Sequence, residues 1–204
     1  MQRAIPPDLS HAHTPDRDGA QQHEAIGDLH LAADNFPGAV EEYAAALGSV
    51  GADAPQERCR LLTQLAEAHT GRGDFDDALE ALHAARATAR VLHDPRVRAR
   101  IAARLANALI QQGDYRRSRR YALYAYRVLR DTDDHRTVGQ VGVTSGLCCA
   151  RLGRAAEAIE WLQNAAATFR RIDDTDGLVT ALNNLGLVYK NLREWREATR
   201  FLEQ

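Results

Sequence analysis

The chain has 204 residues, of which 45% are hydrophobic and 26% charged, and its net charge is −2 at neutral pH. This composition is ordinary for a soluble protein. No stretch reaches 18 consecutive apolar residues, and the start of the chain has no apolar core of a secretory signal, so we expect a cytoplasmic protein without membrane spans. Three cysteines, two of them adjacent, make a poor disulfide framework and are better explained as buried core residues.

The first segment, residues 1–19, holds three prolines and two histidines. Its composition predicts a disordered leader. His11 and His13 could contact a metal, but histidines in a polar tail are more often simply solvated. We therefore expect no metal site in this segment.

The rest of the chain is predicted to form helices in pairs. The expected pairs are 20–34 with 37–50, 54–72 with 75–92, 95–112 with 115–131, 134–152 with 155–172, and 175–192 with 195–204.

Five segments align without gaps at the turn within each pair. Their shared fourth position is separated by 39, 40, 40 and 40 residues and is occupied by Phe36, Phe75, Tyr115, Ala155 and Trp195. Gly73 and its equivalents at 113 and 153 stand where a left-handed residue closes a helix, a conformation that glycine adopts cheaply. Asp74 and Asp114 follow as expected N-caps. This period predicts a repeat protein.

Small residues recur where the two helices of a pair would cross. The second helices carry Ala39, Ala78, Ser118, Ala158 and Ala198, and the first helices carry Gly27, Ala66, Ala106, Gly146 and Gly186. Small side chains at a crossing allow the close approach of tight antiparallel pairs.

These patterns resemble the tetratricopeptide repeat family. Residues 181–198, ALNNLGLVYKNLREWREA, are similar to the Leu-Gly-x-x-Tyr…Ala signature of that family. The resemblance covers about residues 20–204 and implies an all-α fold, a right-handed α–α superhelix of five helical hairpins. The expected repeats are about 20–53, 54–93, 94–133, 134–173 and 174–204, of which the last is incomplete.

The period of 40 residues departs from the usual length of about 34 in this family. The extra residues most simply lengthen the second helix by a turn or more. Such long repeats are similar to those of bacterial peptide-sensing and transcriptional regulators and of kinesin-light-chain-like adaptors.

Sequence motifs for catalysis or cofactor binding are missing. The chain contains no phosphate-binding loop, no His-Glu-x-x-His and no Cys-x-x-Cys, and its glycines at 139, 142 and 146 have the wrong spacing for a dinucleotide fold. His30 and His69 fall inside the hairpins and are better explained as core histidines with hydrogen-bond partners than as ligands. We therefore expect a protein that is not an enzyme and holds no cofactor or metal.

Charge is segregated along the chain. Residues 1–83 have a net charge of −10, residues 84–130 have +10, and residues 131–204 have −2. The basic segment 84–130 includes Arg116, Arg117, Arg119 and Arg120 at the start of an expected second helix. Second helices are expected to form the convex outer face of the array. A nucleic-acid patch is one interpretation. A solvated face, or a docking site for an acidic partner, fits better because aromatic interleaving is not evident and the whole chain is slightly acidic.

The resemblance implies that first helices line a concave groove that binds a protein or an extended peptide. The aligned candidates are Arg60, Thr63, Glu67, Arg100, Arg104, Asn107, Gln111, Gln140, Arg151, Asn183, Lys190 and Asn191, with Gln21, Glu24 and Asp28 in the first repeat. Amide side chains such as Asn107 and Asn183 can bracket a peptide bond, and Arg60, Arg100 or Arg104 could hold a carboxylate. An ordinary solvated inner face is the alternative.

Two functions remain open at this point. The first is a protein- or peptide-binding scaffold. The second is the N-terminal sensory or regulatory segment of a larger bacterial signalling or transcription regulator, whose effector domain lies beyond residue 204. The second is suggested by the last helix, which stops early without the polar cap that solenoids require. If the chain is complete, a second copy could cover that open end.

Overall fold

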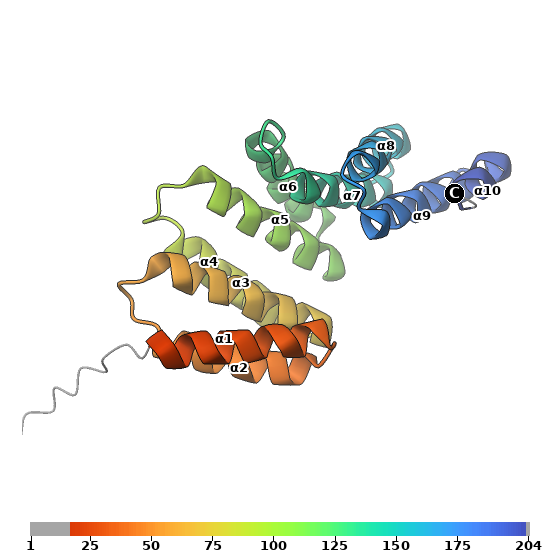
Figure 1. Cartoon of the computed structure of the whole chain (residues 1–204). Helices are drawn as coiled ribbons and strands as arrows, with labels where there is room; N and C mark the ends of the chain where they lie inside the picture. Colours follow the sequence, from red (N-terminus) through yellow and green to blue (C-terminus); the bar gives the residue numbers. More distant parts are fainter. Residues whose placement is uncertain (1–16, 203–204) are drawn as a thin grey trace, which may run out of the picture.

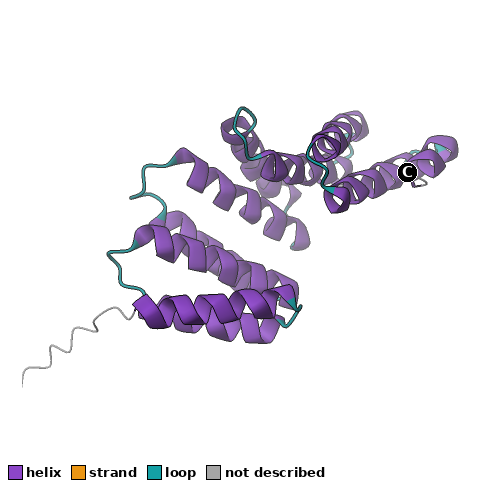
Figure 2. Ribbon diagram, viewed as in Figure 1, coloured by secondary structure: helices purple, strands orange, loops and turns teal. Residues whose placement is uncertain are grey.

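The computed structural model describes residues 17–202, and this part of the chain consists of ten α-helices joined by short turns (Figures 1 and 2). The helices are α1 (Arg17–Ala32), α2 (Phe36–Ser49), α3 (Pro55–Arg72), α4 (Phe75–Thr88), α5 (Pro95–Gln111), α6 (Tyr115–Leu129), α7 (His135–Arg151), α8 (Ala155–Arg171), α9 (Thr175–Asn191) and α10 (Trp195–Leu202). The all-α fold of five consecutive hairpins is confirmed. None of these helices has the length and apolar character needed to cross a bilayer.

Helix α1 begins at Arg17, three residues before the expected start, so the end of the predicted leader is helical. The rest of that leader, residues 1–16, lies outside the described residues, as do His11 and His13.

The prediction that the longer period lengthens the second helix is wrong for the first three hairpins. There the first helix is the longer one: α3 has 18 residues and α4 has 14. Only in the fourth hairpin does the second helix, α8, reach the 17 residues of α7. Pro55 and Pro95 explain part of this, because proline at the first helical position starts α3 and α5 early.

The turns within the hairpins have the predicted left-handed residue. Gly73, Gly113 and Gly153 have φ of 87°, 78° and 77°. In the first and last hairpins Asp34 and Arg193 take the same conformation, with φ of 53° and 63°. The repeated backbone turn is therefore kept even where the glycine is absent.

The two expected N-caps behave differently. Asp114 accepts a hydrogen bond from the backbone N–H of Arg117 at 3.0 Å and caps α6. Asp74 stands at the N-cap position of α4, but its carboxylate accepts from Arg72 instead and makes no capping bond.

The small residues bring the helices of each hairpin together as expected. Ala39, Ala78, Ser118 and Ala158 are fully buried, and Ala198 is nearly so. On the first helices the need for glycine is steric, because a Cβ at Gly27 would lie 2.7 Å from the Tyr43 ring and one at Gly146 would lie 2.6 Å from Leu162.

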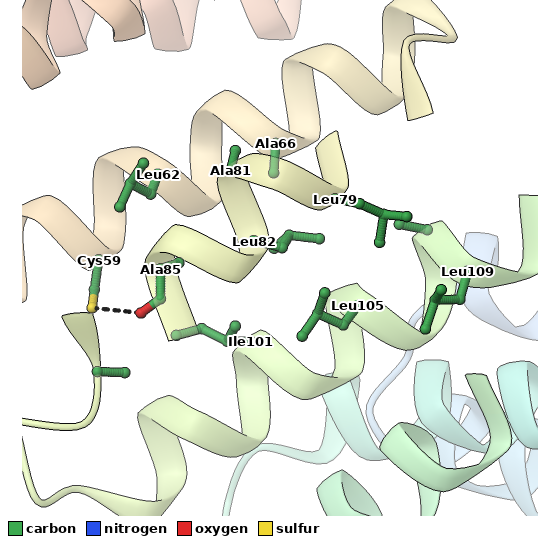
Figure 3. Close-up of a cluster of buried hydrophobic side chains, with 12 residues drawn as sticks. Cys59, Leu62, Ala66, Leu79, Ala81, Leu82, Ala85, Ile101, Leu105 and Leu109 are labelled. Carbon is green, nitrogen blue, oxygen red and sulfur yellow. Dashed lines mark hydrogen bonds between the residues drawn. The ribbon is translucent and has the colours of Figure 1, made fainter. Parts of the chain in front are cut away.

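Successive hairpins pack on one another through continuous apolar clusters. Figure 3 shows one of them, in which Leu62 of α3 and Leu82 of α4 face Ile101 and Leu105 of α5. Cys59 lies at its edge and donates its thiol to the carbonyl of Ala85 at 3.3 Å. The three cysteines are free and buried, as predicted.

Candidate binding groove

A groove of about 720 Å³ runs across the first helix of every hairpin. It passes the last turns of α1 and α3, the middle of α5, the first half of α7 and the first turns of α9. The groove therefore crosses the first helices obliquely rather than at a constant position. This path is what a stack of hairpins produces when each is rotated relative to the one before it.

The oblique path divides the predicted binding residues. Those that line the groove are Glu67, Arg100, Arg104, Asn107 and Gln140. Those that lie outside its lining are Arg60, Thr63, Gln111, Arg151, Asn183, Lys190 and Asn191. The second set was predicted on the assumption that the groove crosses every first helix at the same position of the repeat. The groove has moved away from those positions at both ends of the array, and it does not reach the C-terminal ends of α5 and α7, where Gln111 and Arg151 lie.

Local contacts account for several of the excluded residues. Arg60 pairs with Glu24 at 2.6 Å, and Thr63 donates its hydroxyl to the carbonyl of Cys59 at 2.6 Å. Gln111 lies in a separate shallow depression beside the turn between α3 and α4. Asn183 is exposed on α9.

Arginines within the groove are held by carboxylates of a neighbouring hairpin. Arg104 of α5 pairs with Glu67 of α3 at 2.7 Å, and Arg100 of α5 pairs with Asp134 at the start of α7 at 2.6 Å. These guanidinium groups cross-link successive first helices. They are therefore already engaged, and a ligand carboxylate would have to compete for them.

The next pair along the array repeats this arrangement. Arg136 of α7 pairs with Asp174, the N-cap of α9, at 2.8 Å. The hydrogen bond from the backbone N–H of Gly177 and the one from Arg136 hold the pKa of Asp174 below its usual value. Burial alone would raise the pKa of Asp134, but hydrogen bonds from Arg100 and Thr137 outweigh it and lower that pKa.

Two amide side chains in the groove are free of such pairing. Asn107 of α5 and Gln140 of α7 are both exposed, and neither side chain makes a hydrogen bond to any residue between 17 and 202. Each offers one carbonyl acceptor and two N–H donors toward the groove. They lie on adjacent first helices, so both can contact one extended chain that crosses α5 and α7.

The floor of the groove is apolar. Phe36 and Leu31 contribute at the N-terminal end, Val141 in the middle and Phe169 toward the C-terminal end. Phe169 is 1% exposed, and its ring lies against bare backbone of both α7 and α9. Free amides above an apolar floor suit a ligand that has both peptide groups and apolar side chains.

Comparison with known families agrees with this architecture. Models described as tetratricopeptide repeat match residues 59–96, which include most of the α3–α4 hairpin, and residues 143–204, from α7 onward. The chain is a tetratricopeptide repeat protein.

Solved structures share the fold of this tetratricopeptide repeat protein. BtubC (BKLC) from P. vanneervenii matches 94% of this chain and 80% of its own, with a TM-score of 0.75 and 22% identity. MamA matches 91% of this chain and 89% of its own, at 0.60 and 20%. A Rap protein complexed with Competence and Sporulation Factor matches 90% of this chain and 52% of its own, at 0.78 and 18%. No curated protein sequence matches the chain.

Among the groove residues that the sequence did not predict are Arg136, Phe169 and Asp174. Asp174 precedes the predicted start of a helix, so the sequence could have predicted that it caps this helix. Its pairing with Arg136 could not be predicted, because it depends on how two hairpins stack. Phe169 belongs to a second helix, and a rule that assigns the groove to first helices cannot find it.

Two histidines inside the hairpins carry unpaired nitrogens. Among the described residues, Nδ1 of His69 and Nδ1 of His83 are buried without a hydrogen-bond partner. His69 lies near Asp74 and Asp77, and one ligand atom from each falls within 4.8 Å of the others. Since Arg72 already pairs with Asp74, a metal cation there would have to displace a guanidinium group.

Burial lowers the pKa of His69, and Asp77 only partly offsets it. Burial also lowers the pKa of His83, with a further contribution from Arg86 and Arg117. The unfolded state therefore takes up these protons first, and stability should fall as the pH drops below about 6.5.

The double variant His69→Gln, His83→Gln should lose part of this pH dependence. Urea denaturation of both proteins at about pH 7.5 and 5.5 checks it. An equal drop in midpoint for wild type and variant would contradict the assignment to these two residues.

Proposed function

We propose that this array is a protein-binding scaffold that holds an extended peptide segment in the oblique groove. The carrying observation is the pair of free amides, Asn107 and Gln140, on adjacent first helices above an apolar floor. The amides bracket peptide groups of the ligand, and the floor accepts its apolar side chains.

The arginines take a different role from the one first expected of them. Arg100 and Arg104 cross-link hairpins and keep the groove in shape, so they contribute to binding by pre-organising its walls. In this proposal the ligand carries no essential carboxylate, because the nearest guanidinium groups are neutralised by Asp134 and Glu67.

The groove is tested with peptides selected against the wild-type protein from a random displayed library. For the best peptide, the variant Asn107→Ala, Gln140→Ala should weaken binding about tenfold or more, because each lost hydrogen bond contributes about 1 kcal/mol. Fluorescence anisotropy of the labelled peptide gives Kd, and circular dichroism checks that helicity is kept.

A matched control uses the same two residue types on the outer side of α8. Gln163 and Asn164 are both exposed and lie outside the groove lining. The variant Gln163→Ala, Asn164→Ala should bind like wild type. Unchanged peptide affinity of the groove variant, or an equal loss of affinity in the control variant, would contradict the groove proposal.

A second candidate is a sensory array within a longer signalling protein. The chain matches 52% of the Rap protein and 28% of a signal-transduction ATPase from Pyrococcus horikoshii that has a tetratricopeptide repeat sensor. Val179 is 48% exposed on α9, whereas its equivalents Cys59, Ala99 and Gly139 are buried in earlier hairpins.

The coding sequence past codon 204 separates these possibilities. An effector domain in frame supports the sensory array. A stop codon directly after residue 204 removes it.

A further inference from the structure

The outer face of α6 carries a stripe of free cations that the groove does not use. Arg116, Arg120, Tyr124 and Arg127 follow one another at intervals of four, four and three residues, which places them on one side of the helix. All four are exposed, Tyr124 by 40%. The opposite side of α6, with Ser118, Ala122 and Ala125 among others, is buried.

The stripe differs from the other arginines around it in having no partner. Between residues 17 and 202, none of the side chains of Arg116, Arg120 and Arg127 makes an ion pair or hydrogen bond. The arginines on either side of the stripe are engaged: Arg117 pairs with Asp114 and Arg119 with Glu157. The groove arginines are likewise paired, whereas the three arginines of the stripe are free on the outer face of α6.

The repeat itself does not require these residues. At the positions equivalent to Arg116 and Arg120, α4 has Asp76 and Glu80, and α8 has Ala156 and Glu160. The hairpins of α4 and α8 form equally well with acidic or neutral residues there. The stripe is therefore a property of one hairpin and not of the fold.

Its position is also unfavourable for the helix that carries it. The N-terminus of a helix carries partial positive charge and favours acidic residues in its first turn. Helices α4 and α8 follow this rule with Asp76, Asp77 and Glu157, whereas the first turn of α6, like those of α2, α5 and α7, has no acidic residue, and it contains Arg116 and Arg117. Arg116 and Arg120 therefore add nothing to the stability of α6 through the helix dipole.

We propose that this stripe is a docking site for an acidic, helical segment of a partner protein. Three guanidinium groups spaced over about 16 Å of helix match carboxylates at the same spacing on a helix laid alongside. Tyr124 lies between them and supplies apolar contact with a hydroxyl group at its edge.

The surroundings of the stripe favour an acidic protein helix over a nucleic acid. Side-chain contacts place α4 and α8 on either side of α6, through Arg86 with Tyr121 and Arg119 with Glu157. Both flanking helices carry exposed acidic residues without an ion-pair partner between residues 17 and 202, Glu80 on α4 and Glu160 on α8. A wide polyphosphate surface would meet these carboxylates, whereas a single acidic helix can follow the basic stripe alone.

The test uses a labelled, helix-forming peptide with glutamates at intervals of four and seven residues, and a scrambled peptide of the same composition. The triple variant Arg116→Gln, Arg120→Gln, Arg127→Gln should weaken binding of the patterned peptide about tenfold or more in fluorescence anisotropy. The wild type should prefer the patterned peptide to the scrambled one, and its affinity should fall as salt is raised.

The matched control removes three other exposed, unpaired arginines: Arg170→Gln, Arg193→Gln, Arg196→Gln. It has the same net charge as the test variant and should bind like wild type. The test variant should melt close to wild type, because Arg116 and Arg120 lie near the N-terminus of α6, where cations are unfavourable, and the loss of exposed Arg127 from its last turn costs little. The variant Arg116→Glu, Arg120→Glu should in turn bind a peptide with lysines at the matching positions.

Equal losses in test and control variants would overturn the proposal in favour of a general charge effect. Tighter binding of single-stranded RNA or duplex DNA than of the patterned peptide would overturn it in favour of a nucleic-acid surface. The groove variant Asn107→Ala, Gln140→Ala should keep its affinity for the acidic peptide, so this proposal and the proposed function can fail separately.

Discussion

Replacing Phe169 with alanine is expected to lower the free energy of unfolding by about 3–5 kcal/mol, the range for large buried aromatic residues. The ring is 1% exposed and joins three helices. A Cβ at Gly139 of α7 would lie 2.6 Å from it, and one at Gly177 of α9 would lie 2.3 Å from it. Because neither glycine has a side chain to refill the space, the cavity should persist. Urea denaturation followed by circular dichroism measures the loss.

Leu29→Ala is the control for this prediction. Leu29 is 72% exposed on α1, so its removal should change stability by no more than about 0.5 kcal/mol. Partial recovery of stability by Gly139→Ala in the Phe169→Ala background would support the packing argument. A loss below about 1 kcal/mol for Phe169→Ala would show that α7 and α9 collapse onto the space, against the expectation.

Asp134→Ala should cost about 2 kcal/mol, because it removes two functions at once. The carboxylate caps α7 through the backbone N–H of Thr137 and accepts from Arg100 of the preceding hairpin. A lost N-cap alone costs about 0.5–2 kcal/mol. Asp134→Asn should cost less, since asparagine can still cap the helix. Chemical denaturation near neutral pH measures both variants.

The pH dependence separates the charge from the cap. Hydrogen bonds lower the pKa of Asp134 in the folded protein, so its ionised form stabilises the fold above the unfolded pKa of about 3.9. That contribution is lost as the pH falls through the folded pKa. The difference between wild type and Asp134→Asn should therefore shrink in acid. Asp131→Ala, at an 82% exposed site, should show little effect at any pH, and a constant difference for Asp134→Asn would contradict the electrostatic explanation.

Phe169 and the ion pair of Arg100 with Asp134 hold together the hairpins that form the groove. Phe169 holds α7, α8 and α9 in place from below, and the pair of Arg100 with Asp134 ties α5 to α7 from the side. Either substitution should therefore also weaken peptide binding, without touching Asn107 or Gln140. If these two variants lose peptide affinity in proportion to their loss of stability, Phe169 and Asp134 act by positioning the groove. Asn107→Ala and Gln140→Ala should instead lose affinity while keeping the stability of wild type.

The hairpins themselves could be predicted from the sequence because their determinants are local. The left-handed residue at Gly73, Gly113 and Gly153 and the small residues at the crossings each act within one turn or one helix pair. Such signals survive in a single sequence because neighbouring residues in the chain are also neighbours in space. The sequence did not predict which helix of a hairpin takes up the residues beyond the usual repeat length. The prediction was wrong in three hairpins because the repeat period does not say where a helix ends.

The lining of the candidate groove depends on how successive hairpins are placed against one another. Asn107 and Gln140 were predicted and do line the groove, because both lie near its centre, in the middle of α5 and the first half of α7. Asn183 and Lys190 lie outside it, because the rotation accumulated over successive hairpins moves the groove toward the start of α9. The sequence by itself thus determined the repeat and its turns, which follow from contacts over a few residues. Only the tertiary structure decided which first-helix residues share a groove and which arginines are already paired, because both depend on how one hairpin is rotated against the next.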